Sequence, residues 1–310
     1  PLILIILAAS AFLQYLQTPA PDARDPNTGD SGNTMVADTS RDTSRDTSSD
    51  TSSDTSMASA AAMNANFQGP LRVYEPNPIW LTDEDKEAIM VTGVHTWNVL
   101  RDIGPTNPPP EFDFTAFIDM MAGYNHNFLR LWVWDMVQGV DANVYGREPN
   151  WVAPMPWQRI SEEAMLEQGL DPAADSNPPF DLSQLDDSYF ERLRERVIAA
   201  GERGIYVSIM LFEGFGPHFN DDGSHPFQGG NNINDIDVGR ALDFYNDEAL
   251  NNPAVWDKQI AYVNRVIDTV NDLENVLYEI SNETPNESVN WQYTMIEHIN
   301  DYQADKANQH

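Results

Sequence analysis

The stretch VLYEISNE, at residues 276–283, is an apolar run that ends in an asparagine and a glutamate. Its aliphatic and aromatic residues favour a β-strand, and the proline at position 285 cannot continue a ladder of hydrogen bonds. The preceding residues 256–273 have the spacing of an amphipathic helix. Such an order of helix, strand and loop is typical of parallel α/β folds, in which side chains at the carboxyl ends of strands form the active site. The sequence therefore predicts that Asn282 and Glu283 lie at a functional edge of a sheet.

The chemistry expected of Glu283 follows from this position. A glutamate held at the mouth of a cleft and partly shielded from water can keep its proton near neutral pH and donate it to a leaving oxygen. The neighbouring Asn282 would then hydrogen-bond a substrate hydroxyl. The same Asn-Glu pair could also start an ordinary surface turn. The pattern of the surrounding sequence has to distinguish the two interpretations.

The same alternation extends towards the amino terminus. Further strands are predicted at residues 88–97 (AIMVTGVHTW), 128–134 (FLRLWVW) and 205–212 (IYVSIMLF). Further helices are predicted at residues 113–123, 187–204 and 289–307. Strict alternation of strands and helices predicts a parallel sheet with right-handed crossovers.

Each predicted strand ends in polar or aromatic side chains. These residues are His95, Trp97, Arg130, Trp132, Trp134, Glu213, Asn282 and Glu283. Functional residues at the carboxyl ends of successive strands are typical of a (β/α)8 TIM barrel. A doubly wound nucleotide-binding sheet is the alternative, but no glycine-rich phosphate loop follows the first predicted strand.

Five segments together resemble one family. They are similar to the cellulase-like glycoside hydrolases of the retaining (β/α)8 superfamily, nearest to the apiosidase-like and putative cellulase group: GVHTWNVLRD, YNHNFLRLWVWD, YFERLRERVIAAGERGIYVSIMLFEG, GGNNIND and NVLYEISNE. The similarity covers residues 73–310. It implies that Glu283 is the acid/base, that Asn282 contacts the sugar next to the scissile bond, and that the nucleophile is a second glutamate near the end of a seventh strand.

Counting the elements leads to an expectation about completeness. The pattern supplies four strand-helix units before His310, whereas a closed barrel of this kind has eight. We therefore expect roughly the first four units of a truncated barrel, without the nucleophile and inactive alone. Glu279 lies four residues before Glu283 on the same strand, which separates the two backbones by about 13 Å. Retaining hydrolysis needs carboxyls about 5–5.5 Å apart, so Glu213 is the only fallback partner, and an orienting role suits Glu213 better.

Other side chains have weaker assignments. Glu279 should be buried and would need a partner, for which Arg130 is the candidate, as a structural ion pair. His95 would contact substrate or satisfy a hydrogen bond in the core. Trp97, Trp132 and Trp134 would stack against sugar rings or pack in the core. The long connection at residues 135–185 is expected to form a wall of the substrate cleft.

Composition excludes several classes of partner. The chain has 310 residues, 49 acidic and 17 basic, with a net charge of −32, so it should repel nucleic acid and anionic membranes. It has no cysteine, which excludes disulfides and zinc-cysteine sites. No metal or other cofactor is predicted, because His218, Asp221, Asp222 and His225 match no zinc spacing and the sequence has no EF-hand. A Gly-x-Ser-x-Gly elbow is also missing, which argues against a serine esterase.

The amino-terminal residues predict export. Residues 1–20 contain an apolar run that resembles a shortened signal peptide or a membrane anchor. Residues 21–66 are rich in Asp, Ser and Thr and predict a disordered linker, which leaves residues 67–310 for the catalytic domain. The expected protein is secreted or on the bacterial cell surface, with a plant or algal oligo- or polysaccharide as substrate and at most a membrane tether through its amino terminus. A non-catalytic carbohydrate-binding barrel and a structural surface protein are the alternatives.

Overall fold

The computed structural model describes residues 66–85, 87–138, 150–219 and 223–310. At its centre is a three-stranded parallel sheet in the order β4 (Phe128–Leu131), β8 (Tyr206–Glu213) and β9 (Val276–Asn282). Every residue of β8 is buried, as expected of a central strand covered on both faces. Three of the four predicted strands are therefore present, and they are parallel and lie next to one another in one sheet.

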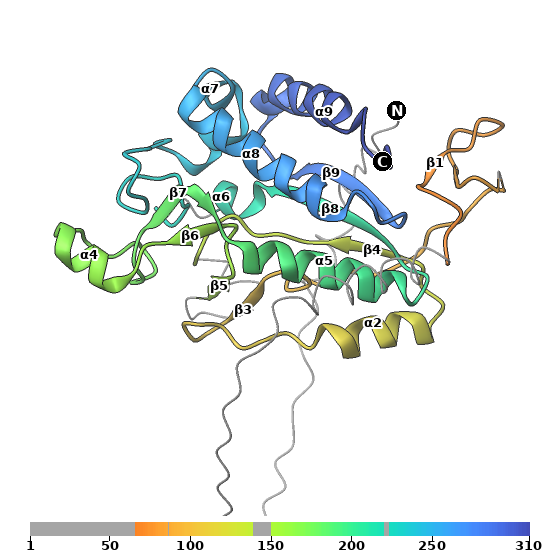
Figure 1. Cartoon of the computed structure of the whole chain (residues 1–310), viewed down its shortest axis with the longest axis horizontal. Coiled ribbons are helices and arrows are strands. Elements are labelled where there is room, and N and C mark those ends of the chain that lie inside the picture. Colours follow the sequence, from red (N-terminus) through yellow and green to blue (C-terminus); the bar gives the residue numbers. More distant parts are fainter. Residues whose placement is uncertain (1–65, 86, 139–149, 220–222) are drawn as a thin grey trace, which may run out of the picture.

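Four long helices accompany the sheet (Figure 1). They are α2 (Phe114–Gly123), α5 (Asp187–Gly201), α8 (Pro253–Val270) and α9 (Val289–Gln303). Helix α5 packs against α2, α8 and β8, and α9 packs against α8 and β9. The crossovers between the parallel strands thus run through helices, as the alternation in the sequence predicted.

The helix ends follow local chemistry. Helix α8 begins three residues before its predicted start because the Asn252 side chain accepts a hydrogen bond from the backbone N–H of Ala254 and Pro253 occupies the first turn. Helix α5 ends at Gly201, three residues before the predicted end. Gly204 has a φ of 70°, a left-handed conformation that turns the chain from the helix into β8.

The predicted strand at residues 88–97 is wrong. This segment makes only isolated bridges, from Ile89 to Leu81 and from Gly93 to Phe128. The Asn127 side chain takes up the backbone groups that a ladder would use, since its Oδ1 accepts from Thr92 N at 2.8 Å and its Nδ2 donates to the Met90 carbonyl at 3.0 Å. The Asn127 side chain, where a strand would have the backbone of a neighbouring strand, therefore holds this segment beside β4. The segment does not become a strand.

The remaining strands form three small antiparallel pairs. β1 (Arg72–Val73) pairs with β2 (Leu81–Thr82), β3 (Asp102–Gly104) with β5 (Trp151–Ala153), and β6 (Trp157–Arg159) with β7 (Phe180–Leu185). A short helix, α4 (Glu162–Gln168), lies between β6 and β7 in the chain. The fold is mixed α/β, and the described residues form no closed barrel.

Short helical turns fill the loops at the carboxyl edge of the sheet. They are α6 (Phe215–Phe219), the 3-10 helix η2 (Ala241–Tyr245), α7 (Asp247–Leu250) and the 3-10 helix η3 (Asn286–Ser288). Aromatic rings fill the core between the sheet and the helices. The ring of Phe212 on β8 lies 5.6 Å from that of Tyr262 on α8 and 5.2 Å from that of Trp291 on α9, and this packing fixes both helices against the strand that ends in Glu213.

The first described residue is Asn66, the last residue of the predicted linker. Asn66 donates to the carbonyl of Gly201 at 3.1 Å, and Phe67 packs 4.8 Å from Tyr206. The predicted signal peptide or anchor at 1–20 and nearly all of the predicted linker at 21–66 lie outside the described residues. Among the residues that are described, no helix combines the length and hydrophobicity needed to cross a bilayer.

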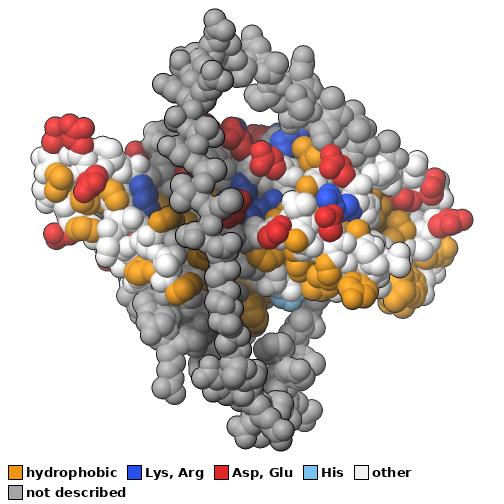
Figure 2. Space-filling model, turned by 90° about the horizontal axis from the view of Figure 1, so that it is seen from below, with side chains coloured by type: hydrophobic (Ala, Val, Ile, Leu, Met, Phe, Trp, Pro, Cys, Tyr) orange, Lys and Arg blue, Asp and Glu red, His pale blue; other side chains and the backbone are white. Residues whose placement is uncertain are grey.

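The face that includes α2 is shown in Figure 2. Hydrophobic side chains gather on the right half of this view, with acidic side chains scattered among them. Met120 of α2 and Tyr124, the residue directly after this helix, are exposed hydrophobic side chains, at 38% and 73%.

Candidate active site

The parallel register brings the predicted edge residues together. Glu213 at the end of β8 pairs with Asn282 at the end of β9, and Gly214 N donates to the Asn282 carbonyl at 2.8 Å. Glu283 follows directly, at the start of the loop that leads to α9. Both carboxylates and the amide therefore lie at one edge of the sheet.

Glu283 has an unusual backbone conformation. Its φ of 47° lies in the left-handed region, which is uncommon for a residue with a side chain. A Cβ added to Gly214 would lie 2.8 Å from the carbonyl oxygen of Glu283 and 2.9 Å from the Cα of Thr284, so this close approach requires glycine. Conformations of this kind persist where the surrounding structure imposes them, and they are concentrated at functional sites.

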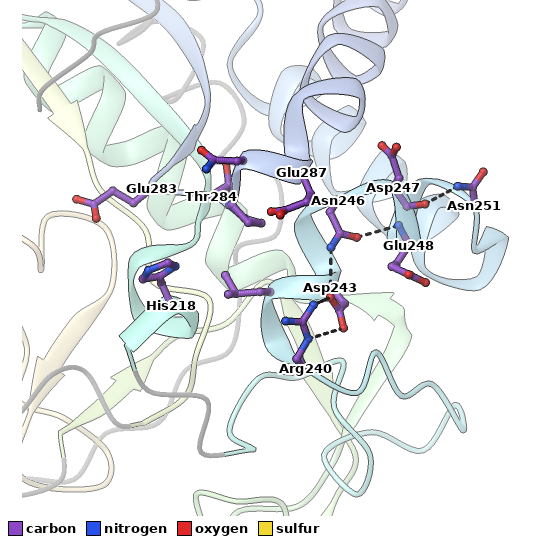
Figure 3. A pocket seen from close by; sticks show the side chains of 13 residues that line it. His218, Arg240, Asp243, Asn246, Asp247, Glu248, Asn251, Glu283, Thr284 and Glu287 are labelled. Carbon is purple, nitrogen blue, oxygen red and sulfur yellow. Dashed lines mark hydrogen bonds and ion pairs between the residues drawn. The ribbon is translucent and has the colours of Figure 1, made fainter.

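An open cleft of about 850 Å³ lies beside Glu283 (Figure 3). The described residues that line it are His218 of α6, several side chains of the segment 240–251, and the loop 283–287. In Figure 3 the Glu283 carboxylate is exposed and points away from those of Asp243 and Glu287.

The residues that line this cleft differ from the predicted ones. No described lining residue comes from the connection at 135–185, which was expected to form the wall. Within that connection Trp157 is buried against Phe227 and Tyr262, because β6 and β7 turn its side chain into the core. The following connection, between β8 and α8, supplies the wall instead.

Arg130 joins two residues of β9. Its Nε donates to Glu279 Oε2 at 2.6 Å and its Nη2 donates to Glu279 Oε1, which confirms the predicted ion pair. The same Nη2 donates to Asn282 Oδ1 at 3.0 Å. Both Arg130 and Glu279 are mostly buried, so their ion pair links β4 to β9 and holds the guanidinium in place beside Asn282.

Glu213 is fully buried and accepts several hydrogen bonds. Its Oε1 accepts from Phe215 N at 2.5 Å and from Asn282 Nδ2 at 3.3 Å, and its Oε2 accepts from Gly216 N at 3.1 Å. Burial raises the pKa of Glu213 to about 8 and outweighs the opposing effect of these hydrogen bonds; the nearby Asp135 adds to the rise. At neutral pH this carboxyl is therefore mostly protonated.

A second buried network lies behind Glu213 and was not foreseen from the sequence. Asp135 Oδ2 accepts from the Glu213 backbone N–H at 2.9 Å and from the Tyr245 hydroxyl at 3.1 Å. Arg101 lies 3.5 Å from the other oxygen of Asp135. The one available signal was the aspartate that ends the apolar run FLRLWVWD, in the same position as Glu213 after its own strand.

His225 belongs to this network. Its Nδ1 accepts from Phe227 N at 3.2 Å, so Nε2 carries the proton towards the Tyr245 oxygen, 3.3 Å away. Burial, with a contribution from Arg101, lowers the pKa of His225 to about 3. Asp221 and Asp222 lie outside the described residues. In the part of the chain that is described, no three metal-ligating side chains cluster.

The predicted aromatic contacts separate into two kinds. His95 is exposed and stacks on Trp132 at 5.1 Å, and Arg130 lies 4.7 Å over the same indole. Partial burial of the ring and the charge of Arg130 lower the pKa of His95. Trp134 is 1% exposed and donates to the Trp97 carbonyl at 3.0 Å, so it offers no ring face to a ligand in this conformation. Sugar contacts by Trp97 and Trp132 stay a prediction.

Comparisons with known proteins give structural neighbours only. No family model matches the chain, and no curated protein does. A family 5 glycoside hydrolase from Bacteroides vulgatus is similar over 79% of this chain and 39% of its own, with 13% identity and a TM-score of 0.42. A family 5 mannosidase from Rhizomucor miehei is similar over 76% of this chain and 54% of its own, with 15% identity and a TM-score of 0.44. A mutant of that mannosidase in complex with mannosyl-fructose gives 14% identity and a TM-score of 0.45. The chain thus spans 39–54% of the length of these structures, which are glycoside hydrolases at low sequence identity.

Proposed function

We propose that this protein is a glycoside hydrolase that cleaves O-glycosyl bonds by retaining double displacement, with Glu283 as the acid/base. The observation that carries the proposal is the placement of Glu283. It follows β9 directly, has a left-handed backbone and stands on the wall of an 850 Å³ cleft. A carboxyl in this position can reach a glycosidic oxygen of a substrate bound in the cleft.

In this mechanism Glu283 protonates the leaving sugar oxygen and then, as the carboxylate, activates the water that releases the second product. The nucleophile is a second glutamate. Neither Glu213 nor Glu279 suits that role, because Glu213 is buried and mostly protonated at neutral pH, and Glu279 is paired with Arg130. We propose that the nucleophile comes from elsewhere and that the described residues alone hydrolyse little or nothing.

Asn282 would contact the sugar next to the scissile bond. Asn282 as a residue is 8% exposed, and its side-chain amide is hydrogen-bonded through its oxygen to Arg130 and through its nitrogen to Glu213. One amide hydrogen and one lone pair of the oxygen remain for a hydroxyl. His95, Trp97, Trp132 and Arg130 would complete the binding surface, with His95 exposed beside the Trp132 ring.

The substrate would be a plant or algal polysaccharide, or its side chains, encountered outside the cell. This part of the proposal is supported by the apolar amino-terminal run and the Asp/Ser/Thr-rich segment after it, which suit export and a spacer, and by the acidic composition. A tether to the membrane would involve the amino-terminal residues only.

Turnover of aryl glycosides by the intact natural protein tests the role of Glu283. Glu283→Gln should lose at least about a hundredfold in rate on substrates with poor leaving groups, and much less on good ones, because only poor leaving groups need a proton. The matched control Glu84→Gln changes an exposed glutamate in an ion pair with Arg72 and should keep the wild-type rate. Wild-type rates for Glu283→Gln on both kinds of substrate would contradict the assignment.

A non-catalytic carbohydrate-binding barrel is the second candidate. The engagement of Glu213 and Glu279 in internal contacts favours it, because it leaves Glu283 without a reactive partner among those two. Oligosaccharide binding without any turnover by the intact natural protein would support this alternative over the enzyme.

A further inference from the structure

The buried carboxyl of Glu213 touches two structural elements that both face the cleft. Through Oε1 and Oε2 it accepts the backbone N–H groups of Phe215 and Gly216, the first residues of α6. Through Oε1 it also accepts Asn282 Nδ2, at the end of β9, at 3.3 Å. Helix α6 carries His218 to the cleft wall, and β9 carries Asn282 and then Glu283 to the same edge.

The contact with Asn282 determines which way its amide points. Asn282 Oδ1 accepts from the Arg130 guanidinium at 3.0 Å, and its Nδ2 donates to Glu213. A flipped amide would set two donors, the NH2 group and the guanidinium, against each other; it would also set the amide oxygen against a Glu213 oxygen, and both are acceptors once Glu213 is ionised. Arg130 and Glu213 therefore select one orientation between them, which leaves a defined hydrogen and lone pair for a ligand.

The groups around Glu213 make this arrangement depend on its ionisation. Asp135, which follows β4, accepts a hydrogen bond from the Glu213 backbone N–H and is paired with Arg101. Tyr245 of η2 donates to the same Asp135 and contacts His225. On the β9 side, Asn282 links Glu213 to Arg130, which is paired with Glu279. Burial raises the pKa of Tyr245 well above its usual value and lowers that of His225 to about 3. Neither of these two groups titrates near pH 8, where Glu213 does.

We propose that Glu213 is a positioning residue, whose carboxyl orients the Asn282 amide and anchors the start of α6 so that both are preset for a sugar in the cleft. The positioning itself stands on the contacts above. Its value for sugar recognition rests on the proposed function.

Nuclear magnetic resonance of the full chain tests the positioning without a ligand. As Glu213 ionises near pH 8, its oxygens become stronger acceptors. The backbone amides of Phe215 and Gly216 and the side-chain amide of Asn282 should then shift with one common midpoint. The Asn282 signal is identified by its loss in Asn282→Asp. If Phe215 and Gly216 shift and Asn282 does not, Glu213 only anchors α6 and the proposal is overturned. If none of the three shifts, Glu213 holds neither partner and the proposal is equally overturned.

The variant Glu213→Gln removes the titrating group and should abolish the common midpoint. The exposed substitution Glu84→Gln should leave it in place. A midpoint that persists in Glu213→Gln would assign the titration to another group and overturn the proposal. Should Glu213→Gln fail to fold, the pH titration of the wild-type protein still decides, because it needs no substitution.

Binding of cellohexaose, xylohexaose and mannohexaose by calorimetry then tests the value for recognition. Glu213→Leu, which leaves Asn282 Nδ2 without this acceptor, should weaken binding of the accepted sugar by about fivefold, the effect of one hydrogen bond. In an Asn282→Ala background the same substitution should have no further effect, since Glu213 acts through Asn282. An undiminished effect in that background would overturn this part. If the wild-type protein binds no sugar in the panel, the proposed function fails while the resonance experiment still decides the positioning.

Discussion

At the scale of single residues, burial sets the protonation state of Glu213 at the edge of the sheet. Glu213 accepts three hydrogen bonds and is nevertheless mostly protonated at pH 7, because burial opposes its ionisation more strongly than the donors favour it. Glu283, one strand away, is exposed to solvent in the cleft. The two glutamates at neighbouring strand ends therefore differ in environment: Glu213 is buried in internal contacts, and Glu283 is exposed beside the cleft.

The ionisation of Glu213 should appear in the stability of the protein. Its pKa is raised from 4.5 to about 8 on folding, so between these pH values the folded state binds more protons than the unfolded state. The free energy of unfolding should therefore fall as pH rises from about 4.5 to 8, by on the order of 5 kcal/mol from this group, and then level off. Urea denaturation at a series of pH values measures this slope. Glu213→Gln should flatten it, Glu84→Gln should keep it, and an equal slope in all three proteins would contradict the raised pKa.

Gly214 gives a second residue-scale expectation. An alanine Cβ there would come within 2.8 Å of the Glu283 carbonyl oxygen, so the loop after β9 has to move. Gly214→Ala should cost about 1–3 kcal/mol of stability and weaken both binding and turnover. At Gly123, at the end of α2, an added Cβ meets no atom within 4 Å, so Gly123→Ala should be neutral or slightly stabilising. Equal thermal melting temperatures for the two variants would show that the close approach is not a constraint.

At the scale of elements, strands and helices were predictable where one face was consistently apolar. β8, β9 and the helices α2, α5, α8 and α9 form close to their predicted bounds because burial and local caps agree there. The segment 88–97 failed because the Asn127 side chain occupies its backbone groups, and periodicity carries no information about such a contact. The buried network was missed for a related reason: Asp135 and Tyr245 meet across 110 residues of sequence.

The role of Asn127 as a substitute for a neighbouring strand can be measured. Asn127→Ala would leave the partly buried amide of Thr92 and the exposed carbonyl of Met90 without this partner and should destabilise the protein by about 0.5–1.5 kcal/mol. The amide of Thr92 should exchange faster with solvent. Asn290→Ala, which removes an exposed hydrogen bond to Asp247, should change stability by less than about 0.5 kcal/mol. Unchanged exchange at Thr92 would show that the segment is held by other contacts.

At the scale of the whole molecule, charge dominates. With 49 acidic and 17 basic residues the folded chain repels itself, and salt screens that repulsion within about 10 Å at 0.1 M and 3 Å at 1 M. Exposed ion pairs such as Arg194 with Asp272 weaken under the same screening, but each contributes at most about 1 kcal/mol. The melting temperature should therefore rise as NaCl increases from 0.05 to about 0.5 M. A steady fall would mean that ion pairs outweigh the repulsion.

More of the fold than of the candidate site could be predicted from the sequence. The order of β4, β8 and β9 and the position of Asn282 and Glu283 at their edge could be predicted, because strand ends are marked by where an apolar run stops. The walls of the cleft could not. Much of its lining comes from the short helical turns at 240–251, and Trp157, in the predicted wall, packs in the core. Which loop faces a cleft depends on side-chain packing between distant segments.

The most direct test of the central claim is the product that the Glu283→Ala variant of the intact natural protein forms in the presence of azide. Without the side chain, a glycosyl-enzyme intermediate lacks the base that activates water, and azide, which needs no base, can attack it instead. An aryl glycoside with a good leaving group should then yield a glycosyl azide with retained anomeric configuration, at a rate that rises with azide concentration. Wild-type turnover by Glu283→Ala without azide, or loss of activity that azide does not restore, would contradict the role of Glu283 as acid/base.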